Sequence, residues 1–436
     1  MVNNGKPKGV ASGVDRRSFL KATGAGSATV ALAGCTETIT GGGGGDGGIP
    51  DTITIGAMGP ADAPFGDSIL KSAQLAADEM NENGGIAGAD VEVLTRDTMD
   101  QPSTARTGYQ ELTSTEGAHA TVGIFGSEQL LALMPEFASA ETVHLTAGAA
   151  STEAPALVAD DYETNKYWFR VGPVNSVFLL EAMIQYAGSQ FEAMGWETVA
   201  VLAEDYKWTE PITSDIESRL VDEVGVDVVD VRRVASGTED FTPVYDQLEA
   251  SDIDGAFTAL AHTGTNSLVQ WAQQQRPFGY GGIHVPTQLP SFYSATQGAA
   301  ISTFSQTTAT PTSEITDKTI PYAEAFNEAN DGYPVYTGYS AYDAMYMLKE
   351  AIESAESVNS DDLVTELENI SYTGTAGNIE FFGQDGEFPH DVRFGEDYTT
   401  GVFFQWQADS EGNGVQEVLW PDNLATGEYV PAPWNQ

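Results

Sequence analysis

The feature that most constrains the fold is a repeated alternation of strand-like and helix-like sequence. Residues 52–58 alternate in polarity and end in a Gly-Pro turn, and apolar side chains then recur at helical spacing as far as residue 80. This order repeats up to residue 147, starts again near residue 175 and continues to residue 286. Because alternating strands and helices favour a parallel sheet with helices on its faces, we expect an α/β chain.

The restart of the pattern predicts two similar lobes. Residues 337–355 form another periodic helix, whereas the chain after residue 370 is rich in strand-like segments. A tail that differs in type from the lobes indicates that the chain crosses between them more than once, with a ligand cleft at the carboxyl ends of the strands. We therefore expect two doubly wound parallel-sheet lobes joined by a multi-strand hinge. The expected lobes comprise residues 51–171 with about 298–357, and residues 172–297 with about 358–436.

The charge of the chain limits its partners. Acidic residues outnumber basic ones by 64 to 18, which gives a net charge of -46. This charge opposes binding to nucleic acid or to an anionic lipid surface. It is also better tolerated at about 1 M salt, where the Debye length falls to roughly 3 Å. We interpret the charge as adaptation to a salt-rich habitat, with an acidic protein of ordinary habitat as the alternative.

The N-terminus has the pattern of an export signal. Arg16 and Arg17, followed by Ser-Phe-Leu-Lys, resemble a twin-arginine signal, although Asp15 stands where Ser or Thr is usual. The apolar stretch 22–34 is shorter than the ~20 residues that a membrane span needs. It ends in Leu-Ala-Gly followed by Cys35, which resembles a lipobox and predicts a lipid anchor on that cysteine.

The segment after the signal is expected to be a tether. We assign residues 1–34 to the signal peptide and residues 35–50, with their run of glycines, to a flexible spacer. The chain has a single cysteine, so it cannot form an internal disulfide. The alternative is a buried core cysteine in a cytosolic enzyme.

Four motifs in the lobes carry a family resemblance. They are Ile55-Gly56-Ala57-Met58-Gly59-Pro60, Phe65-Gly66-Asp67, Asn83-Gly84-Gly85-Ile86-Ala87-Gly88 and Gly338-Tyr339-Ser340-Ala341-Tyr342-Asp343-Ala344. Their order and spacing resemble the type I periplasmic binding proteins of the branched-chain amino-acid ABC transporter family over about residues 51–408. With the charge and the export signal, the resemblance is to a lipoprotein of a halophilic archaeon. It implies a protein on the outer face of the cell membrane, with two lobes that close around a small polar ligand and dock on ABC permease subunits, without a cofactor, a metal or a catalysed reaction.

The resemblance assigns ligand-binding residues in the first lobe. Ser127, at the start of a predicted helix, matches the family serine that holds the ligand carboxylate. Gly148, Ala149 and Ser151, together with the intervening alanine, match the amides and hydroxyl after the next strand. A helix N-terminus with free amides favours an anion, which agrees with this assignment. A plain N-cap is the alternative role for Ser127.

The second lobe is expected to supply an aromatic wall and the contacts to the ligand amine. Trp208 matches the family aromatic position, with Phe65 facing it from the first lobe. His262 lies in another family contact region, with a solvated loop histidine as the alternative. Gln288 stands where the family usually has a glutamate, so an α-ammonium would lose a charge-assisted hydrogen bond unless Asp205, or Glu204 before it, replaces that acid.

The missing glutamate leaves several ligands open. They are a branched-chain or other amino acid, an amide, a urea-like solute, or a carboxylate without an α-amine. Two other functions also remain: a surface protein that senses a ligand, and a surface α/β hydrolase. The hydrolase is disfavoured because the chain has no Gly-x-Ser-x-Gly, His-Glu-x-x-His or Walker motif.

Overall fold

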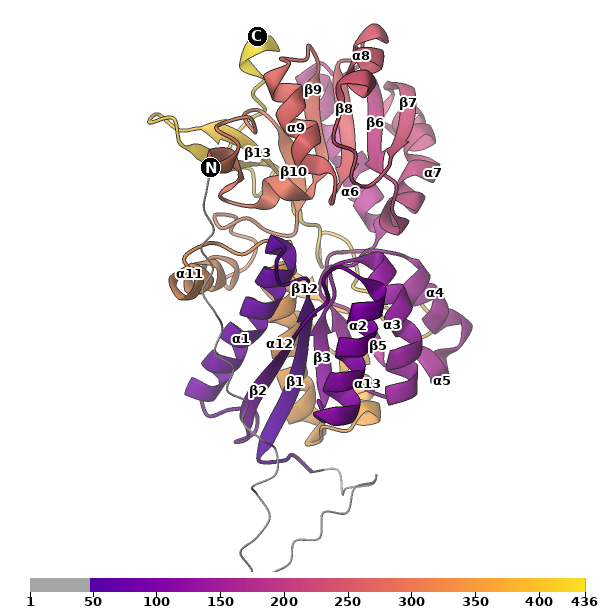
Figure 1. Ribbon diagram of the computed structural model, residues 1–436, viewed down its shortest axis with the longest axis vertical. Coiled ribbons are helices and arrows are strands. Elements are labelled where there is room, and N and C mark those ends of the chain that lie inside the picture. The colour runs from indigo at the N-terminus through magenta and orange to yellow at the C-terminus, as the bar shows by residue number, and fades with distance from the viewer. Residues whose placement is uncertain (1–47, 436) are drawn as a thin grey trace, which may run out of the picture. The chain divides into compact units, whose positions relative to one another are not determined.

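The computed structural model describes residues 48–435 (Figure 1). The expected signal peptide at 1–34, the lipid-carrying Cys35 and the tether as far as residue 47 lie outside the described residues. Within 48–435, no helix combines the length and the apolar character that a bilayer crossing requires.

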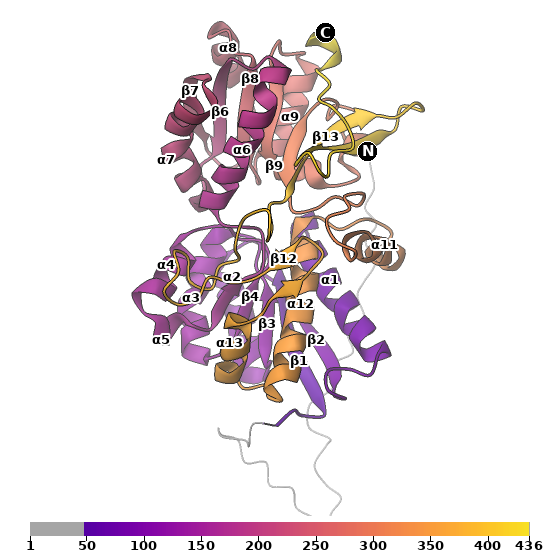
Figure 2. The same ribbon diagram turned by 180° about the vertical axis from the view of Figure 1, so that it is seen from behind.

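The first lobe is built on a five-stranded sheet in the order β2-β1-β3-β4-β5, in which all neighbouring strands are parallel. Its strands are β1 (Thr52–Gly59), β2 (Asp90–Asp97), β3 (Ala120–Gly123), β4 (His144–Thr146) and β5 (Trp168–Arg170). Its helices are α1 (Pro64–Glu82), α2 (Pro102–Gln110) with η1 (Glu111–Thr115), α3 (Ser127–Ala140), α4 (Glu153–Asp160), α5 (Tyr162–Asn165), α11 (Thr319–Asn330), α12 (Tyr336–Ala355) and α13 (Ser360–Glu368). Helices α2 and α3 cover one face of this sheet and α1, α12 and α13 the other (Figures 1 and 2), so the first lobe is doubly wound as expected.

The second lobe has a seven-stranded sheet in the order β14-β13-β10-β9-β8-β6-β7. The strands are β6 (Thr198–Glu204), β7 (Asp227–Val234), β8 (Gly255–Leu260), β9 (Gly279–His284), β10 (Phe304–Thr307), β13 (Val402–Ala408) and β14 (Gly414–Trp420). The helices are α6 (Ser176–Met194), η2 (Lys207–Thr209), α7 (Glu210–Arg219) with η3 (Leu220–Val224), α8 (Thr242–Ala250), α9 (Gly264–Gln273), η4 (Val285–Gln288), α10 (Phe292–Ala295) and η5 (Pro433–Asn435). Pairs from β7 to β10 are parallel, whereas β13 and β14 are antiparallel additions from the tail.

The chain crosses between the two sheets three times, after β5, after β10 and before β13. These crossings differ from the boundaries expected near residues 298 and 358. Strand β10 pairs with β9 in the second sheet, while α13 packs on α12 beside the first sheet. Strand β10 gave no sequence signal because it is only four residues long and three of them are polar. A small ladder of β11 (Tyr372–Thr373) with β12 (Asn378–Ile379) lies on the third crossing.

Alternation along the strands explains the core. In β1, Ile53, Ile55 and Ala57 are fully buried, and the continuously buried β3, β4 and β8 have both faces covered by helices. In α1, Ile69, Ala73, Ala76, Ala77 and Met80 form the buried face that the helical spacing predicts. Both sheets therefore present the carboxyl ends of their parallel strands toward the crossings, which is where the candidate site lies.

Candidate functional site

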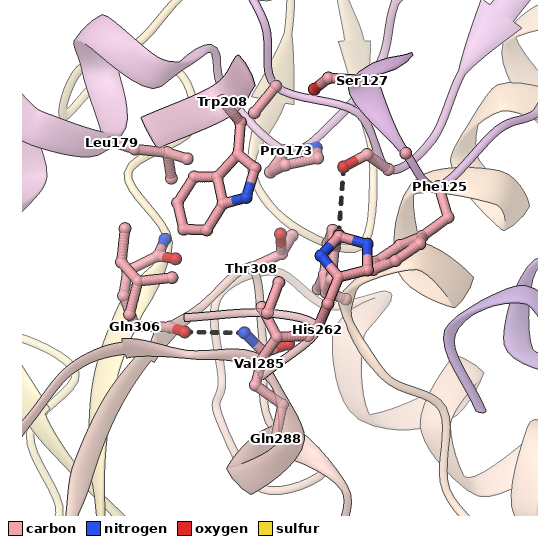
Figure 3. Close-up of a pocket in the computed structure, with 16 residues that line it drawn as sticks. Phe125, Ser127, Pro173, Leu179, Trp208, His262, Val285, Gln288, Gln306 and Thr308 are labelled. Carbon is pink, nitrogen blue, oxygen red and sulfur yellow. Dashed lines mark hydrogen bonds between the residues drawn. The ribbon is translucent and has the colours of Figure 1, made fainter. Parts of the chain in front are cut away.

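A pocket lies between the lobes, at the carboxyl ends of strands from both sheets (Figure 3). The space between its walls is about 490 Å³, a volume that includes open solvent at its mouth. The lining residues from the first lobe and its crossing are Phe125, Gly126, Ser127, Gly148, Ala150, Pro173 and Tyr336. Those from the second lobe and its crossing are Leu179, Trp208, Ala261, His262, Ile283, Val285, Gln288, Gln306 and Thr308.

Ser127 is the first residue of helix α3, at the wall of the pocket. The helix begins here because Gly126 adopts an extended conformation, and no side chain caps the helix. The alternative role of Ser127 as the N-cap is therefore wrong, since Gly126 occupies that position. The Oγ of Ser127 instead accepts a hydrogen bond of 3.2 Å from the backbone N–H of Ser151. The N-terminal amides of a 14-residue helix thus face the pocket region without a side-chain cap.

Gly148 allows two loops of the first lobe to approach closely. A Cβ at this position would lie 2.8 Å from the Cα of Phe125, so any side chain would push these loops apart. The carbonyl of Gly148 accepts a hydrogen bond of 3.1 Å from the Tyr336 hydroxyl. Tyr336 begins helix α12 and so links this loop to the opposite face of the sheet.

Trp208 forms much of the second-lobe wall. It lies in the short helix η2 after β6, and it is 7% exposed. In Figure 3 its indole lies between Leu179 and Pro173, which also line the pocket. The indole Nε1 donates a hydrogen bond of 2.8 Å to the Glu204 carboxylate, which fixes the plane of the ring.

Glu204 lies behind this wall and is fully buried. Its Oε1 accepts from Trp208 and lies 2.9 Å from Nδ1 of His262, and its Oε2 accepts from the backbone N–H groups of Ala261 and His262. Burial alone would raise the pKa of Glu204, but the hydrogen bonds from His262 and Trp208 and the charge of His262 outweigh it and lower the pKa. Glu204 is therefore an ionised carboxylate whose two oxygens are already used by the protein.

Gln288 presents a free hydrogen-bond acceptor to the pocket. Its Nε2 donates to the carbonyl oxygen of Gln306 at 2.9 Å (Figure 3), which identifies the amide nitrogen and leaves Oε1 as the remaining acceptor. Within the described residues, Oε1 is buried and has no hydrogen-bond partner. A buried acceptor of this kind is costly unless something donates to it.

The structure brings five of the predicted binding residues into the pocket wall. They are Ser127, Gly148, Trp208, His262 and Gln288. Because 81% of the His262 side chain is covered (19% exposed) and it contacts residues of both lobes, the alternative of a solvated loop histidine is wrong.

The other four predicted residues do not line the pocket. Phe65 stacks behind Phe125 with ring centroids 4.9 Å apart. Ala149 is buried in the core, and Ser151 contacts the pocket only through its N–H to Ser127. The side chain of Asp205 is 65% exposed and pairs with Arg233 at 2.8 Å.

Sequence reasoning missed several lining residues. Phe125, Pro173, Leu179, Ile283 and Val285 read as ordinary core residues of strands and helices. Gln306 lies in β10, Thr308 follows it at the start of the second crossing, and Tyr336 begins α12. Their presence in the pocket depends on where the chain crosses between the lobes, and only Gly-Tyr-Ser-Ala-Tyr-Asp-Ala just after Tyr336 gave a usable signal.

Comparison with known proteins decides the family. The sequence profile described as periplasmic binding protein matches residues 52–399, which is most of the chain. This chain belongs to the periplasmic binding protein family. The predicted family and the predicted fold of two lobes are confirmed. Members of this periplasmic binding protein family are extracytoplasmic substrate-binding proteins of ABC transporters rather than enzymes.

The relatives of this periplasmic binding protein differ in their ligands. The leucine-, isoleucine-, valine-, threonine- and alanine-binding protein of Pseudomonas aeruginosa is 22% identical over 352 residues, which are 76% of this chain and 86% of that protein. The structure of the branched-chain amino acid transporter substrate-binding protein LivJ of Streptococcus pneumoniae, in complex with isoleucine, has a TM-score of 0.69 at 19% identity and covers 85% of this chain and 100% of its own. A solute-binding protein of Rhodopseudomonas palustris in complex with 3,4-dihydroxybenzoic acid has a TM-score of 0.71 at 16% identity and covers 89% and 100%.

Proposed function

We propose that this protein is the solute-binding component of an ABC importer, held at the outer face of the cell membrane by a lipid on Cys35. In this proposal the two lobes close around a small solute that bears a neutral N–H donor, such as a carboxamide or a substituted urea, and an apolar body. The closed form would then deliver the solute to permease subunits. Ligand binding would favour the closed form because contacts from both lobes exist only there.

The unpaired Oε1 of Gln288 is the observation that carries the ligand class. An acceptor that is buried and has no partner within the described residues calls for a donor from the ligand. A neutral amide N–H suits a neutral glutamine, whereas an ammonium buried in the pocket would need a carboxylate. Among residues 48–435, no aspartate or glutamate lines this pocket.

The nearby acids do not replace the missing glutamate. Asp205 points away to Arg233, and both oxygens of Glu204 are occupied by Trp208, Ala261 and His262. An α-ammonium would therefore meet only the neutral Gln288, which lowers the expected affinity for an amino acid by the value of a charged hydrogen bond, about 1.5–3 kcal/mol.

The remaining walls suit the other two parts of such a solute. The Ser127 end of helix α3 offers donors to a carbonyl or carboxylate oxygen. Leu179, Trp208, Ile283 and Val285 offer an apolar surface to a branched or aromatic body. Relatives that bind branched-chain amino acids and hydroxybenzoic acids are consistent with a family pocket that keeps an apolar wall and varies its polar contacts.

A thermal-shift experiment with three matched compounds tests the ligand class. Leucine, 4-methylpentanoate and 4-methylpentanamide share one branched body and differ in their polar groups. In multi-molar KCl we expect the amide to raise the unfolding temperature most, because it alone offers a neutral N–H to Gln288. A ligand at 100 times its Kd stabilises the folded protein by about 2.7 kcal/mol, so the shift is measurable. A response to leucine alone would contradict the amide assignment and favour a branched-chain amino-acid binding protein, to which the Pseudomonas aeruginosa relative points.

Binding by Gln288 variants then locates the contact. Gln288→Leu removes the acceptor and should abolish the preference for the amide over 4-methylpentanoate. Gln288→Glu should shift the preference toward leucine, because it restores a carboxylate opposite the ammonium. An unchanged preference in both variants would show that Gln288 does not select the ligand.

A further inference from the structure

Four ionisable side chains meet across the lobes beside the pocket. Asp100, in the loop after β2, and Glu128, in α3, belong to the first lobe, while Glu204 and His262 belong to the second. We call these four residues the interlobe cluster. Three of the four are acids, yet no group of His, Cys, Asp or Glu within residues 48–435 has an arrangement that could hold a metal ion. The protonation of these four side chains therefore depends on the contacts that they make with one another and with their neighbours.

His262 is the centre of the interlobe cluster. Its Nδ1 lies 2.9 Å from Oε1 of Glu204, and its Nε2 lies 3.6 Å from Oδ2 of Asp100 in the opposite lobe. The ring is held between two aromatic rings, Tyr206 of its own lobe at 4.3 Å and Phe125 of the first lobe at 5.2 Å, measured between centroids. The Nε2 atom is buried and has no hydrogen-bond partner within the described residues.

Asp100 is held in place to face this nitrogen. Its Oδ1 accepts a hydrogen bond of 2.8 Å from Nε2 of Gln129, which leaves Oδ2 toward His262. Met99 and Asp100 have φ angles of 50° and 52°, so two consecutive residues other than glycine adopt the left-handed conformation. Met99 is 64% exposed and packs little surface in return. Backbone strain of this kind persists where other contacts impose it, and it clusters at functional sites.

We propose that protonated His262 stabilises the closed form through Asp100, its partner in the opposite lobe. Glu204 is a positioning residue, because its contact with Nδ1 of His262 leaves Nε2 directed at Asp100. His262 then contributes to affinity through lobe closure and not only through its surface in the pocket. The inference rests on the proposed function only in taking closure as the event that traps a solute. The contacts among Asp100, Glu204 and His262 do not depend on which solute binds.

The charges around His262 agree with this geometry. Burial alone would lower the pKa of His262, but the hydrogen bond and charge of Glu204, followed by the charges of Asp100 and Glu128, outweigh it and raise the pKa above its ordinary value. In the described part of the chain, no Lys or Arg side chain bonds to His262, and Lys207 contacts the cluster by donating its backbone N–H to Glu128. Glu204 belongs to the same lobe as His262 and contacts it in either form, whereas closure brings up the charges of Asp100 and Glu128. Protonated His262 therefore favours closure at low pH, and this contribution is lost as pH rises through the pKa of His262.

Salt is not expected to remove this contact. The Debye length of about 3 Å in 1 M salt screens charges that are exposed and far apart, but it screens buried pairs in direct contact much less. Glu204 is fully buried, and the side chains of His262 and Asp100 are 19% and 33% exposed. The cluster can therefore act under the salt-rich conditions that the composition suggests.

The distance between the lobes tests the proposal without any ligand. Spin labels would be placed on cysteines at Leu157 in α4 and Val221 in η3, which are 38% and 46% exposed and lie in opposite lobes, in the full chain carrying Cys35→Ser. Electron–electron distance measurements at pH 6 and pH 9 in multi-molar KCl then give the ratio of closed to open molecules. We expect this ratio to fall by about threefold or more between pH 6 and pH 9.

Two variants and one control separate the proposal from general electrostatics. Asp100→Asn should lower the ratio at pH 6 and remove most of its pH dependence. Glu204→Gln should have the same two effects. If the Glu204 variant does not fold, Asp100→Asn alone tests the proposal, because Asp100 is partly exposed and its substitution disturbs the fold less. The control is Glu153→Gln, which breaks another contact between the lobes, from Lys207 Nζ to Glu153 at 3.0 Å, without touching His262. It should lower the ratio equally at both pH values.

Two results would overturn the inference. One is a ratio that is the same at pH 6 and pH 9 in the parent chain, and the other is a pH dependence that Asp100→Asn leaves intact. Failure of the proposed function would look different. In that case 4-methylpentanamide, 4-methylpentanoate and leucine would all leave the unfolding temperature unchanged, while the pH-dependent ratio would persist without ligand.

Discussion

The indole Nε1 of Trp208 lies 2.8 Å from Oε1 of Glu204, so the aromatic wall of the pocket is fixed by a fully buried carboxylate. A hydrogen bond to a charged group contributes about 1.5–3 kcal/mol, more than a neutral one. This contact gives Trp208 one orientation before a ligand arrives, which reduces the entropy lost on binding.

Trp208→Phe should weaken binding of 4-methylpentanamide less than Trp208→Ala. Phenylalanine keeps an aromatic face but loses the hydrogen bond that orients it, whereas alanine also removes the apolar wall. We expect a loss of about 1 kcal/mol for Phe and about 3 kcal/mol for Ala, measured by calorimetry. Val229→Ala, at an exposed position in β7, is the matched control and should leave the Kd unchanged. Equal losses in both Trp208 variants would contradict the role of the buried hydrogen bond.

Ser127→Ala should reduce affinity, and it should lower the free energy of unfolding by about 1–3 kcal/mol because the buried N–H of Ser151 loses its acceptor. Gly126, not Ser127, occupies the N-cap, so the helix does not lose a cap when the hydroxyl is removed. A weakening of about 1 kcal/mol for 4-methylpentanamide is expected from the loss of one hydrogen bond. A large loss of stability with unchanged affinity would show instead that the bond from Ser151 to Ser127 serves only to hold the loop.

Asp343 should make the free energy of unfolding depend on pH. Burial raises its pKa to about 7, although Thr375 donates to both carboxylate oxygens. An acid whose pKa is higher in the folded chain destabilises it as pH rises from the unfolded value, near 4, to the folded one. The difference in unfolding free energy between the parent and Asp343→Asn should therefore change by on the order of 3 kcal/mol between pH 4 and pH 8. A constant difference over this range would contradict the prediction.

The unfolding temperature should rise steeply with salt. A net charge of -46 produces self-repulsion in the compact state, which is screened as the Debye length falls. We expect a rise of more than about 10 °C between 0.2 M and 3 M KCl, followed by scanning calorimetry. An unfolding temperature that does not depend on salt would refute the proposed adaptation to a salt-rich habitat.

Cys35→Ser should move the protein from the membrane fraction to the soluble fraction. A lipid on Cys35 would provide the anchor, and the serine variant lacks the thiol that would carry this lipid. Fractionation of the expressing cells, with detection of the protein in each fraction, measures the change. Retention of the serine variant in the membrane fraction would rule out the anchor at this position.

The sequence predicted the helices of both lobes from their apolar periodicity and most of the sheet strands as short apolar runs, but it did not predict the three-residue strand Trp168–Arg170. The helix from Pro64 to Glu82 and the helix from Tyr336 to Ala355 follow that periodicity closely. The short strand Phe304–Thr307 was missed because four residues with mostly polar side chains carry no periodic signal. Its pairing with β9 and β13 supplies the hydrogen bonds that make it a strand.

The family, the two lobes and five residues of the pocket wall could be obtained from the sequence, since each of those five follows a strand end or begins a helix. The tertiary structure decided the rest. It turned Asp205 outward to Arg233, buried Ala149 and used Glu204 to hold both Trp208 and His262. Local sequence fixes which residues lie at the end of a strand. The direction of each side chain, and the partner that uses its hydrogen bonds, depend on segments from the opposite lobe and from the crossings, which only the folded chain brings together.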